Sequence, residues 1–282
     1  MKPQKHGSFH QKHSLGQNFI EDEALLSQLA ELSLVTAEDC VLEIGPGFGA
    51  LTKPLAERAK QVVSLEIDRT LIPILNVTLE KYANARVICD DVMRTNLSAL
   101  VAEAFGADCP SLRVAANLPY YITTDVLTKL MRELPQAKSI AVMIQKEGAQ
   151  RICAQAGTAQ YGAFTLLCQY YADCELLYDV PPSCFLPAPK VTSSVIRMTV
   201  RGKPPVEVPD ETLFFQVVRA AFAQRRKTLV NTLSTLLGKD VDKSTIKALI
   251  CACNLTETVR GERLSFADFA ELTQKIVKLR QK

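Results

Sequence analysis

The chain has 282 residues, 48% of them hydrophobic, and a formal net charge of +3 at pH 7. This length and apolar content allow one large core with a small second domain, and they exclude a disordered chain or a globally basic nucleic-acid coat. No apolar run approaches ~20 residues and the start is polar, so we expect neither a membrane span nor a signal peptide. Nine cysteines, mostly in apolar segments, indicate free thiols of a cytoplasmic protein.

The first segment, residues 1–20, predicts a flexible basic arm. It carries Lys2, Lys5 and Lys12, no acidic residue and all three histidines of the chain. A proline and a glycine oppose a fixed helix here, so we assign the histidines no metal-binding or catalytic role. We expect this arm to be disordered in the absence of ligand, and we expect no metal site elsewhere in the chain.

A glycine-rich turn follows the first predicted strand, residues 40–44. Gly45, Gly47 and Gly49 stand at alternate positions, and a helical pattern comes after them. The order of strand, glycine turn and helix is typical of nucleotide sites, because glycines let the backbone approach a ligand closely. The spacing Gly-x-Gly-x-Gly differs from the Gly-x-Gly-x-x-Gly of pyrophosphate binders, so it disfavours a dinucleotide site.

Acidic residues end the next two predicted strands. Glu66 lies at the end of the strand near 62–67, where a carboxylate can accept hydrogen bonds from both hydroxyls of a ribose. Asp90 and Asp91 follow the strand near 86–89, and a carboxylate there could accept a hydrogen bond from an adenine amine. Together, the glycine turn and these acidic residues suit a nucleoside bearing a positive sulfonium better than a dinucleotide.

The tetrapeptide Asn117-Leu118-Pro119-Tyr120 follows the fourth predicted strand and precedes an amphipathic helical pattern. The Asn117 side-chain oxygen and the Leu118 carbonyl oxygen offer two acceptors to an amino group with two donor hydrogens. The ring of Tyr120 can stack on a planar base. These features favour a site for the exocyclic amine of a nucleobase over the alternative, a simple turn with a half-buried tyrosine.

The later segments complete an α/β fold. No helix signal separates the last two predicted strands, so these must pair antiparallel. We therefore predict a mostly parallel sheet with one reversed strand near an edge, a linker after residue 201, and only helices beyond residue 210. The predicted strands lie near 40–44, 62–67, 86–89, 112–116, 138–144, 174–180 and 193–200.

These motifs together resemble a known family. The four strand ends look like class I S-adenosylmethionine-dependent methyltransferases, and the Asn-Leu-Pro-Tyr motif narrows this to enzymes that methylate adenine amines. Further stretches resemble the ribosomal RNA adenine dimethyltransferase family, in particular the bacterial small-subunit (16S) enzymes of the kasugamycin-sensitivity type. These stretches are residues 14–20, 145–147, 185–195 and 225–229, and the resemblance extends from about residue 12 to the C-terminal helices.

The resemblance implies a Rossmann-like seven-stranded sheet with one antiparallel strand, plus a small all-helical C-terminal domain. We place the catalytic domain at residues 21–203 and a helical RNA-binding domain at 210–282. The implied contacts with S-adenosyl-L-methionine are Gln17, Asn18 and Ile20 at its methionine end, Gly45, Gly47 and Gly49 in the turn, Glu66 at the ribose, Asp91 at the adenine, and Asn117 near the methyl group. The family usually has glycine where Asp90 stands, which leaves open which of the two carboxylates faces the cofactor.

The expected reaction is in-line transfer of a methyl group to the exocyclic nitrogen of adenine. Asn117 and Leu118 would accept the two amine hydrogens and aim the nitrogen lone pair, so proximity and alignment supply most of the rate and no strong base is required. The target adenine must leave its stack, and Tyr120 and Phe185 would hold it between them. A loop aromatic that only caps the core is the alternative for Phe185.

Local basic groups predict where RNA binds. Arg225, Arg226 and Lys227 follow an apolar helical pattern, and the resemblance favours a phosphate clamp there over a capped helix end. Lys190, in the loop that carries Phe185, is a further candidate. The expected partner is 16S rRNA in the small (30S) ribosomal subunit or its precursor, and we take a monomer as the default.

The leading interpretation is dimethylation of two adjacent adenines in the 3′-terminal hairpin of 16S rRNA, late in ribosome biogenesis. One alternative is the related large-subunit rRNA methyltransferase that gives macrolide resistance. A second alternative, from another class, is a non-catalytic RNA-binding assembly factor. A DNA adenine methyltransferase is disfavoured because no target-recognition domain is evident.

Overall fold

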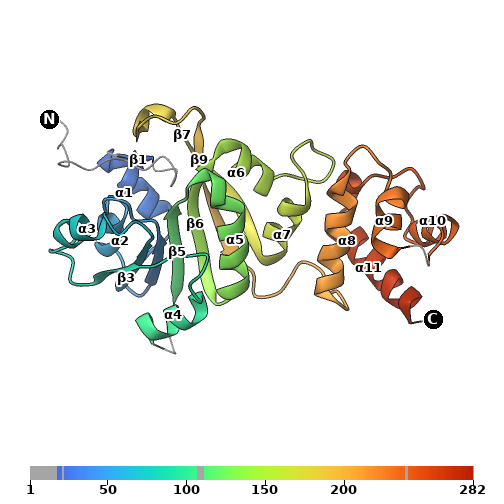
Figure 1. The fold of residues 1–282 in the computed structure, drawn as a ribbon, viewed down its shortest axis with the longest axis horizontal. Helices are drawn as coiled ribbons and strands as arrows, with labels where there is room; N and C mark the ends of the chain where they lie inside the picture. Colours follow the sequence, from blue (N-terminus) through green and yellow to red (C-terminus); the bar gives the residue numbers. More distant parts are fainter. Residues whose placement is uncertain (1–17, 21, 107–110, 239–240, 282) are drawn as a thin grey trace. The chain divides into compact units, whose positions relative to one another are not determined.

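The structure is a computed structural model that describes residues 18–20, 22–106, 111–238 and 241–281 (Figure 1). Its contacts divide the chain into two compact units. The first runs up to Lys146 and adds Leu177–Arg197, and the second joins Glu147–Leu176 to Met198–Lys282. This division differs from the boundary expected near residues 203–210, because Tyr161, Leu166 and Tyr170 pack in one apolar cluster with residues of the C-terminal helices.

The predicted seven-stranded sheet is confirmed, in the order β4-β3-β2-β5-β6-β9-β7. The pairs β2–β3, β2–β5, β3–β4 and β5–β6 are parallel. No crossover helix joins β7 to β9, so these neighbours run antiparallel. The strands are β2 (Cys40–Ile44), β3 (Gln61–Glu66), β4 (Ala85–Cys89), β5 (Leu112–Asn117), β6 (Ala137–Gln145), β7 (Ala172–Val180) and β9 (Ser193–Val200).

The register of the parallel strands brings their carboxyl ends to one edge of the sheet. Ile44 of β2 pairs with Leu65 of β3 and with Ala116 of β5, and Glu66 of β3 pairs with Cys89 of β4. The residues that follow these positions therefore emerge side by side. This is the edge at which open α/β sheets bind their ligands.

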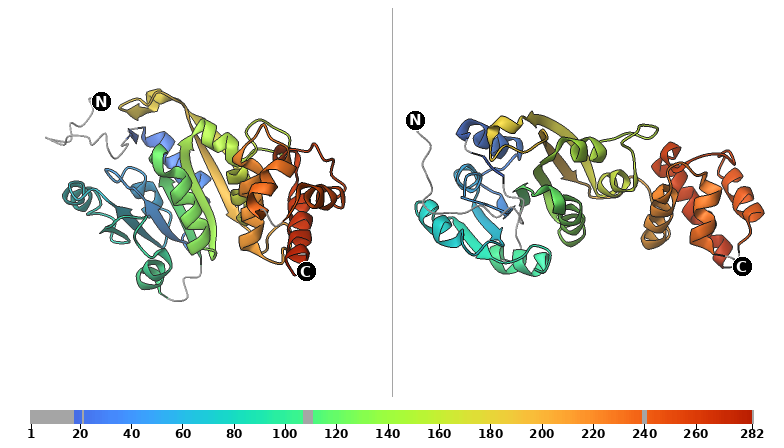
Figure 2. Two further views of the ribbon diagram at one scale, coloured as in Figure 1. Left: turned by 45° about the vertical axis from the view of Figure 1, so that its right-hand side comes forward. Right: turned by 45° about the horizontal axis from the view of Figure 1, so that its top comes forward.

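Helices cover the sheet, and α1 and α5 lie on opposite faces of it (Figures 1 and 2). Alternate strand residues such as Val41, Val62 and Ala115 share a core with α1 and α2. Their buried neighbours point to the other face, as the pleat of a strand requires. The helical segments of this unit are α1 (Glu23–Leu32), α2 (Thr52–Ala56), α3 (Ile72–Thr78), α4 (Leu97–Phe105), η2 (Tyr120–Ile122), α5 (Thr123–Glu133) and η3 (Pro182–Cys184).

A small second sheet was not predicted. Strand β1 (Phe19–Ile20) pairs antiparallel with β8 (Phe185–Leu186), with Ile20 opposite Phe185. The predicted flexible arm, residues 1–20, lies outside the described residues up to position 17, and its end does not match the expectation because Phe19 and Ile20 form a strand. Strand β1, whose residues line the cavity described below, is therefore paired with a strand of the loop before β9.

The second unit contains the helices expected beyond residue 210, together with two earlier ones. Tyr170 packs against Phe214 and Phe215, with ring centroids 5.4 and 5.1 Å away. No helix among the described residues is both long and apolar enough to cross a membrane. The segments are α6 (Lys146–Ile152), α7 (Ala163–Tyr171), α8 (Glu211–Ala223), α9 (Leu229–Leu237), α10 (Lys243–Cys251), η4 (Gly261–Arg263) and α11 (Phe266–Arg280).

Candidate active site

A cavity of about 330 Å³ lies at the carboxyl ends of β2, β3, β4 and β5. It brings together nine of the residues expected at the site: Asn18, Ile20, Gly45, Gly47, Glu66, Asp91, Asn117, Leu118 and Tyr120. Gln17 lies outside the described residues. The register of the sheet explains the convergence, because each of the four strands ends at this edge.

Glu66 is buried and lines the cavity. Its two carboxylate oxygens accept hydrogen bonds from the backbone N–H groups of Gly47 and Asp68, at 3.2 and 2.8 Å. Burial raises the pKa of Glu66, and these two hydrogen bonds oppose the shift. A carboxylate has about four lone-pair sites, so the group retains acceptor capacity for a diol.

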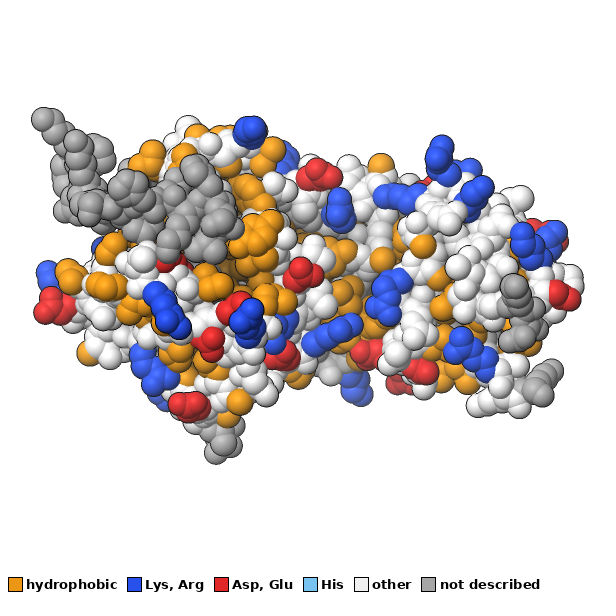
Figure 3. Space-filling model, in the orientation of Figure 1, with side chains coloured by type: hydrophobic (Ala, Val, Ile, Leu, Met, Phe, Trp, Pro, Cys, Tyr) orange, Lys and Arg blue, Asp and Glu red, His pale blue; other side chains and the backbone are white. Residues whose placement is uncertain are grey.

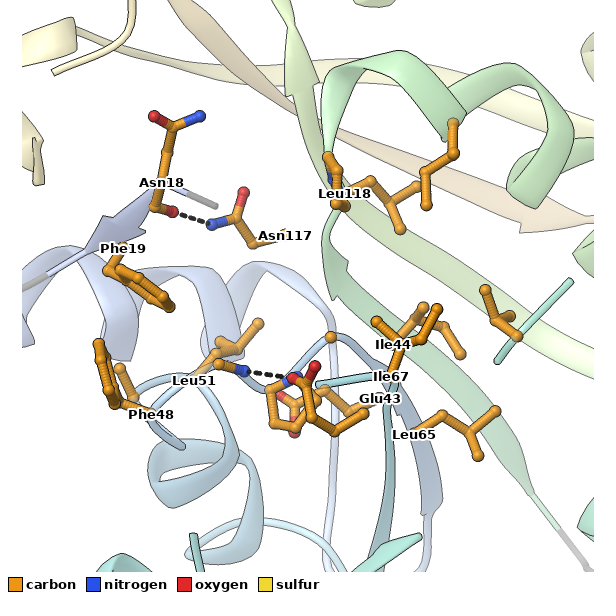
Figure 4. A pocket seen from close by; sticks show the side chains of 18 of the residues that line it. Asn18, Phe19, Glu43, Ile44, Phe48, Leu51, Leu65, Ile67, Asn117 and Leu118 are labelled. Carbon is orange, nitrogen blue, oxygen red and sulfur yellow. Dashed lines mark hydrogen bonds between the residues drawn. The ribbon is translucent and has the colours of Figure 1, made fainter. Parts of the chain in front are cut away.

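The glycine turn approaches an aromatic pair. Gly47 has φ +59°, and a Cβ added there would lie 3.1 Å from the ring of Phe19. The rings of Phe19 and Phe48 have centroids 4.3 Å apart, are tilted by 42° to one another, and lie together at one side of the cavity (Figure 4). Because glycine has no Cβ, the turn can lie in close contact with the Phe19 ring of β1 at this side of the cavity.

Asp91 is less exposed than Asp90, and both line the cavity. Asp91 Oδ1 accepts a hydrogen bond from the Met93 N–H at 2.9 Å, and Asp91 Oδ2 lies 3.6 Å from Arg94 Nε. Asp90 Oδ1 accepts from the Asp91 N–H at 2.8 Å, and this bond lowers the pKa of Asp90. Both carboxylates therefore offer acceptor oxygens to the cavity.

Asn117 has one defined orientation. Its Nδ2 donates a hydrogen bond of 3.2 Å to the carbonyl oxygen of Asn18 (Figure 4). A carbonyl only accepts, so this contact fixes the amide with nitrogen toward Asn18 and leaves Oδ1 as an acceptor. The sequence predicted the acceptor but not the neighbour that orients it.

The rest of the tetrapeptide is held from both sides. The Leu118 N–H donates to the Met143 carbonyl at 3.1 Å, and the Leu118 side chain is buried. Pro119 restricts the backbone angles of the residue before it, and this restricts the direction of the Leu118 carbonyl. The hydroxyl of Tyr120 lies 2.7 Å from Ser193 Oγ, and burial raises the pKa of Tyr120. The Tyr120 ring, half-buried, thus has a fixed position against the cavity.

Two expected site residues lie outside the cavity lining. Phe185 is only 5% exposed and packs in the core with residues of α1 and α2, which is the alternative considered from the sequence. Its partnership with Tyr120 in stacking stays a prediction. A Cβ added at Gly49 would lie 3.3 Å from side chains of Leu75, Thr78 and Leu79, so this glycine allows close packing against α3.

Several lining residues were missed from the sequence. Ile67, Val92 and Met93 each lie one or two positions after a strand-end carboxylate and give the cavity an apolar wall suited to a purine. Their proximity to Glu66 and Asp91 in the chain was the available signal. On the face shown in Figure 3, hydrophobic side chains gather over the first unit.

Glu43 is another missed residue, and it lines the cavity although it is only 1% exposed. Its Oε2 accepts hydrogen bonds from Thr52 Oγ1 and Ser64 Oγ, both at 2.6 Å. Burial raises the pKa of Glu43 to about 7, and the nearby charge of Glu66 acts in the same direction. Glu43 thereby links β2 to β3 and to the first residue of α2.

The expected RNA-binding residues differ in their contacts. Arg225 donates to the carbonyl oxygens of Ala159 and Tyr161, at 2.7 and 3.1 Å, and lies 3.8 Å from Glu262. Arg226, Lys227 and Lys190 are exposed. Among the described residues, no group of three or more histidine, cysteine, aspartate or glutamate side chains is placed to hold a metal.

Comparison with known proteins identifies the family. The profile of the family "Ribosomal RNA adenine dimethylase" matches residues 8–275. The chain belongs to this family. It is 46% identical over 270 residues to "Ribosomal RNA small subunit methyltransferase A" of Geobacillus thermodenitrificans, which covers 95% of this chain and 92% of that relative.

Solved structures agree on the fold. A dimethyladenosine transferase from Plasmodium falciparum superposes with a TM-score of 0.77 at 24% identity, covering 92% of this chain and 98% of that one. The 23S rRNA methyltransferase ErmE gives 0.68 at 23% identity, covering 92% of this chain and all (100%) of that one. Membership of the family makes this chain an rRNA adenine dimethyltransferase that uses S-adenosyl-L-methionine, as its sequence indicated.

Proposed function

We propose that this chain dimethylates two adjacent adenines in the 3′-terminal hairpin of 16S rRNA, within the small ribosomal subunit or its precursor, late in assembly and in the cytoplasm. The orientation of Asn117 carries the chemical part of the proposal. Its Nδ2 is occupied by the Asn18 carbonyl, so its Oδ1 and the fixed Leu118 carbonyl remain to accept from an exocyclic amine.

The cavity residues fit the adenosyl part of the cofactor. Glu66 would accept from the ribose hydroxyls, Asp91 from the adenine amine, and the apolar wall would contact the purine. Asn18 and Ile20, with Gln17 from the preceding segment, would cover the methionine end. When bound, S-adenosyl-L-methionine supplies an electrophilic methyl group on a sulfonium.

The chain's own part in the reaction is alignment. Asn117 Oδ1 and the Leu118 carbonyl would accept the amine hydrogens, which favours a tetrahedral nitrogen with its lone pair directed at the methyl group. Tyr120, fixed through Ser193, would supply one stacking face for the flipped base, and Phe185 the other. Since the proton leaves after the bond forms, Asn117 and Leu118 suffice without a carboxylate base.

Two observations support the small subunit over the large one. The relative at 46% identity is named for the small subunit, whereas the similarity to the 23S enzyme at 23% identity concerns the fold.

The complete set of Glu66, Asp91 and Asn117 opposes the alternative that this chain is a non-catalytic assembly factor. Exposed Arg226, Lys227 and Lys190 would contact RNA phosphates, with residues 210–282 as an RNA-binding domain and the chain acting as a monomer.

The test uses labelled S-adenosyl-L-methionine with small-subunit particles lacking the modification, and large subunits as the parallel substrate. We expect two methyl groups on each of two adenines of the small subunit, recovered as dimethyladenosine. Label confined to the large subunit would replace the proposal with the resistance-type activity. If calorimetry shows that the cofactor binds but neither particle takes up label, the substrate would be another RNA.

A further inference from the structure

Tyr121 is an exposed aromatic residue beside the proposed catalytic turn. The residue is 61% exposed, yet it lines the same cavity as Asn117 and Leu118. Tyr120, one residue earlier, is half-buried and held by Ser193. In a 3₁₀ turn such as η2, successive side chains point about 120° apart. The two rings therefore point in different directions from the turn, and the ring of Tyr121 lies at the mouth of the cavity.

The backbone that carries Tyr121 is fixed. The Ile122 N–H and the Thr123 hydroxyl both donate to the Pro119 carbonyl, at 3.3 and 3.2 Å, and α5 begins at Thr123. A tyrosine side chain has two rotatable χ angles, so little conformational freedom remains to be lost when its ring is covered. Tyr121 is thus a rigid aromatic surface exposed to solvent.

We infer that Tyr121 is a stacking platform for the RNA base that flanks the target adenine. This inference rests on the proposed function. When the target adenine leaves its stack, its neighbour loses a stacking face, and an aromatic ring at the mouth replaces that face. For two adjacent adenines, the platform would hold one adenine while the other is methylated.

The first experiment compares Tyr121→Ala and Tyr121→Phe in steady-state methylation of small-subunit particles lacking the modification. Loss of the ring should raise the KM for the particle by about 5- to 100-fold, with kcat and cofactor affinity little changed. Tyr121→Phe keeps the ring and should match the wild type. Tyr178→Ala is the matched control, because Tyr178 is 40% exposed and does not belong to the described cavity lining.

The second experiment removes the partner instead of the ring. Particles are reconstituted with rRNA that lacks the base flanking the target adenine, on either side in turn. On one of the two sides, we expect the missing base to raise the KM of the wild type as much as Tyr121→Ala raises it on intact particles. With the Tyr121→Ala variant, the same missing base should not raise the KM any further. Additive effects on both sides, or an unchanged KM in Tyr121→Ala, would overturn the inference. Absence of methylation by the wild type would instead count against the proposed function.

Discussion

Asn117 and Asn18 show how single contacts define the chemistry of the site. The amide of Asn117 could present nitrogen or oxygen to a substrate, and one carbonyl 3.2 Å away decides between them. That carbonyl belongs to a residue 99 positions earlier in the chain. An amide in this position accepts from an amine without itself taking a proton.

Glu43 predicts how stability depends on pH. Folding raises its pKa from an ordinary 4.5 to about 7, so the folded state binds the proton more tightly than the unfolded state. The contribution of Glu43 to the free energy of unfolding is present below about pH 4.5 and falls by roughly 3 kcal/mol as pH rises to 7. We expect urea denaturation to show that the free energy of unfolding declines more steeply between pH 5 and 8 in the wild type than in Glu43→Gln. Parallel curves for the two proteins would contradict this assignment, since all other titrating groups are shared.

At the scale of elements, the glycine turn, β1 and β3 form one cofactor-binding structure. Gly47 donates to Glu66 of β3 and lies under the Phe19 ring of β1. The Gly47→Ala substitution puts a Cβ into that contact and also strains a backbone at φ +59°. We expect calorimetry to show that this variant binds S-adenosyl-L-methionine at least about tenfold more weakly than the wild type does.

Gly106→Ala separates strain from contact. Gly106 has φ +89°, and a Cβ there would meet no atom within 4 Å. Both substitutions should reduce the free energy of unfolding by roughly 1–3 kcal/mol, because both force an L-residue to adopt a positive φ. Only Gly47→Ala should weaken cofactor binding. Equal cofactor affinities in the two variants would show that the Phe19 contact is unimportant.

The sequence predicted the elements of the large sheet well, because each strand is a short apolar run bounded by turn residues. It did not predict β1 and β8, since two-residue strands carry no periodic pattern and pair across a long separation in the chain. The same limit applies to Phe185, whose burial depends on that pairing, and to Arg225, whose carbonyl acceptors lie 64 and 66 residues earlier. Local patterns indicated which residues share an edge of the sheet, and long-range contacts decided which of them face the cavity.

At the scale of the whole molecule, residues 210–282 are the proposed RNA-binding domain. Arg225 and Arg226 are adjacent but differ in role. Arg225→Ala removes two hydrogen bonds to carbonyl oxygens and should lower the melting temperature. Arg226→Ala should leave stability within about 0.5 kcal/mol and weaken binding to the small-subunit particle.

Salt dependence distinguishes the two arginines. Each phosphate contact contributes about 0.7–0.9 to the slope of log affinity against log salt concentration. The slope should fall by about that amount in Arg226→Ala, measured by filter binding over a range of salt concentrations. An unchanged slope in Arg226→Ala, or a normal melting temperature in Arg225→Ala, would contradict this division of roles.

The measurement that tests the central claim most directly is the rate of dimethyladenosine formation in a single turnover, for the wild type and Asn117→Ala. Calorimetry with S-adenosyl-L-methionine serves as the control for an intact cofactor site. Since Asn117 acts by aligning the amine, we predict that Asn117→Ala still binds cofactor but methylates small-subunit rRNA about 100-fold more slowly or worse. Methylation by Asn117→Ala at the wild-type rate would contradict the account.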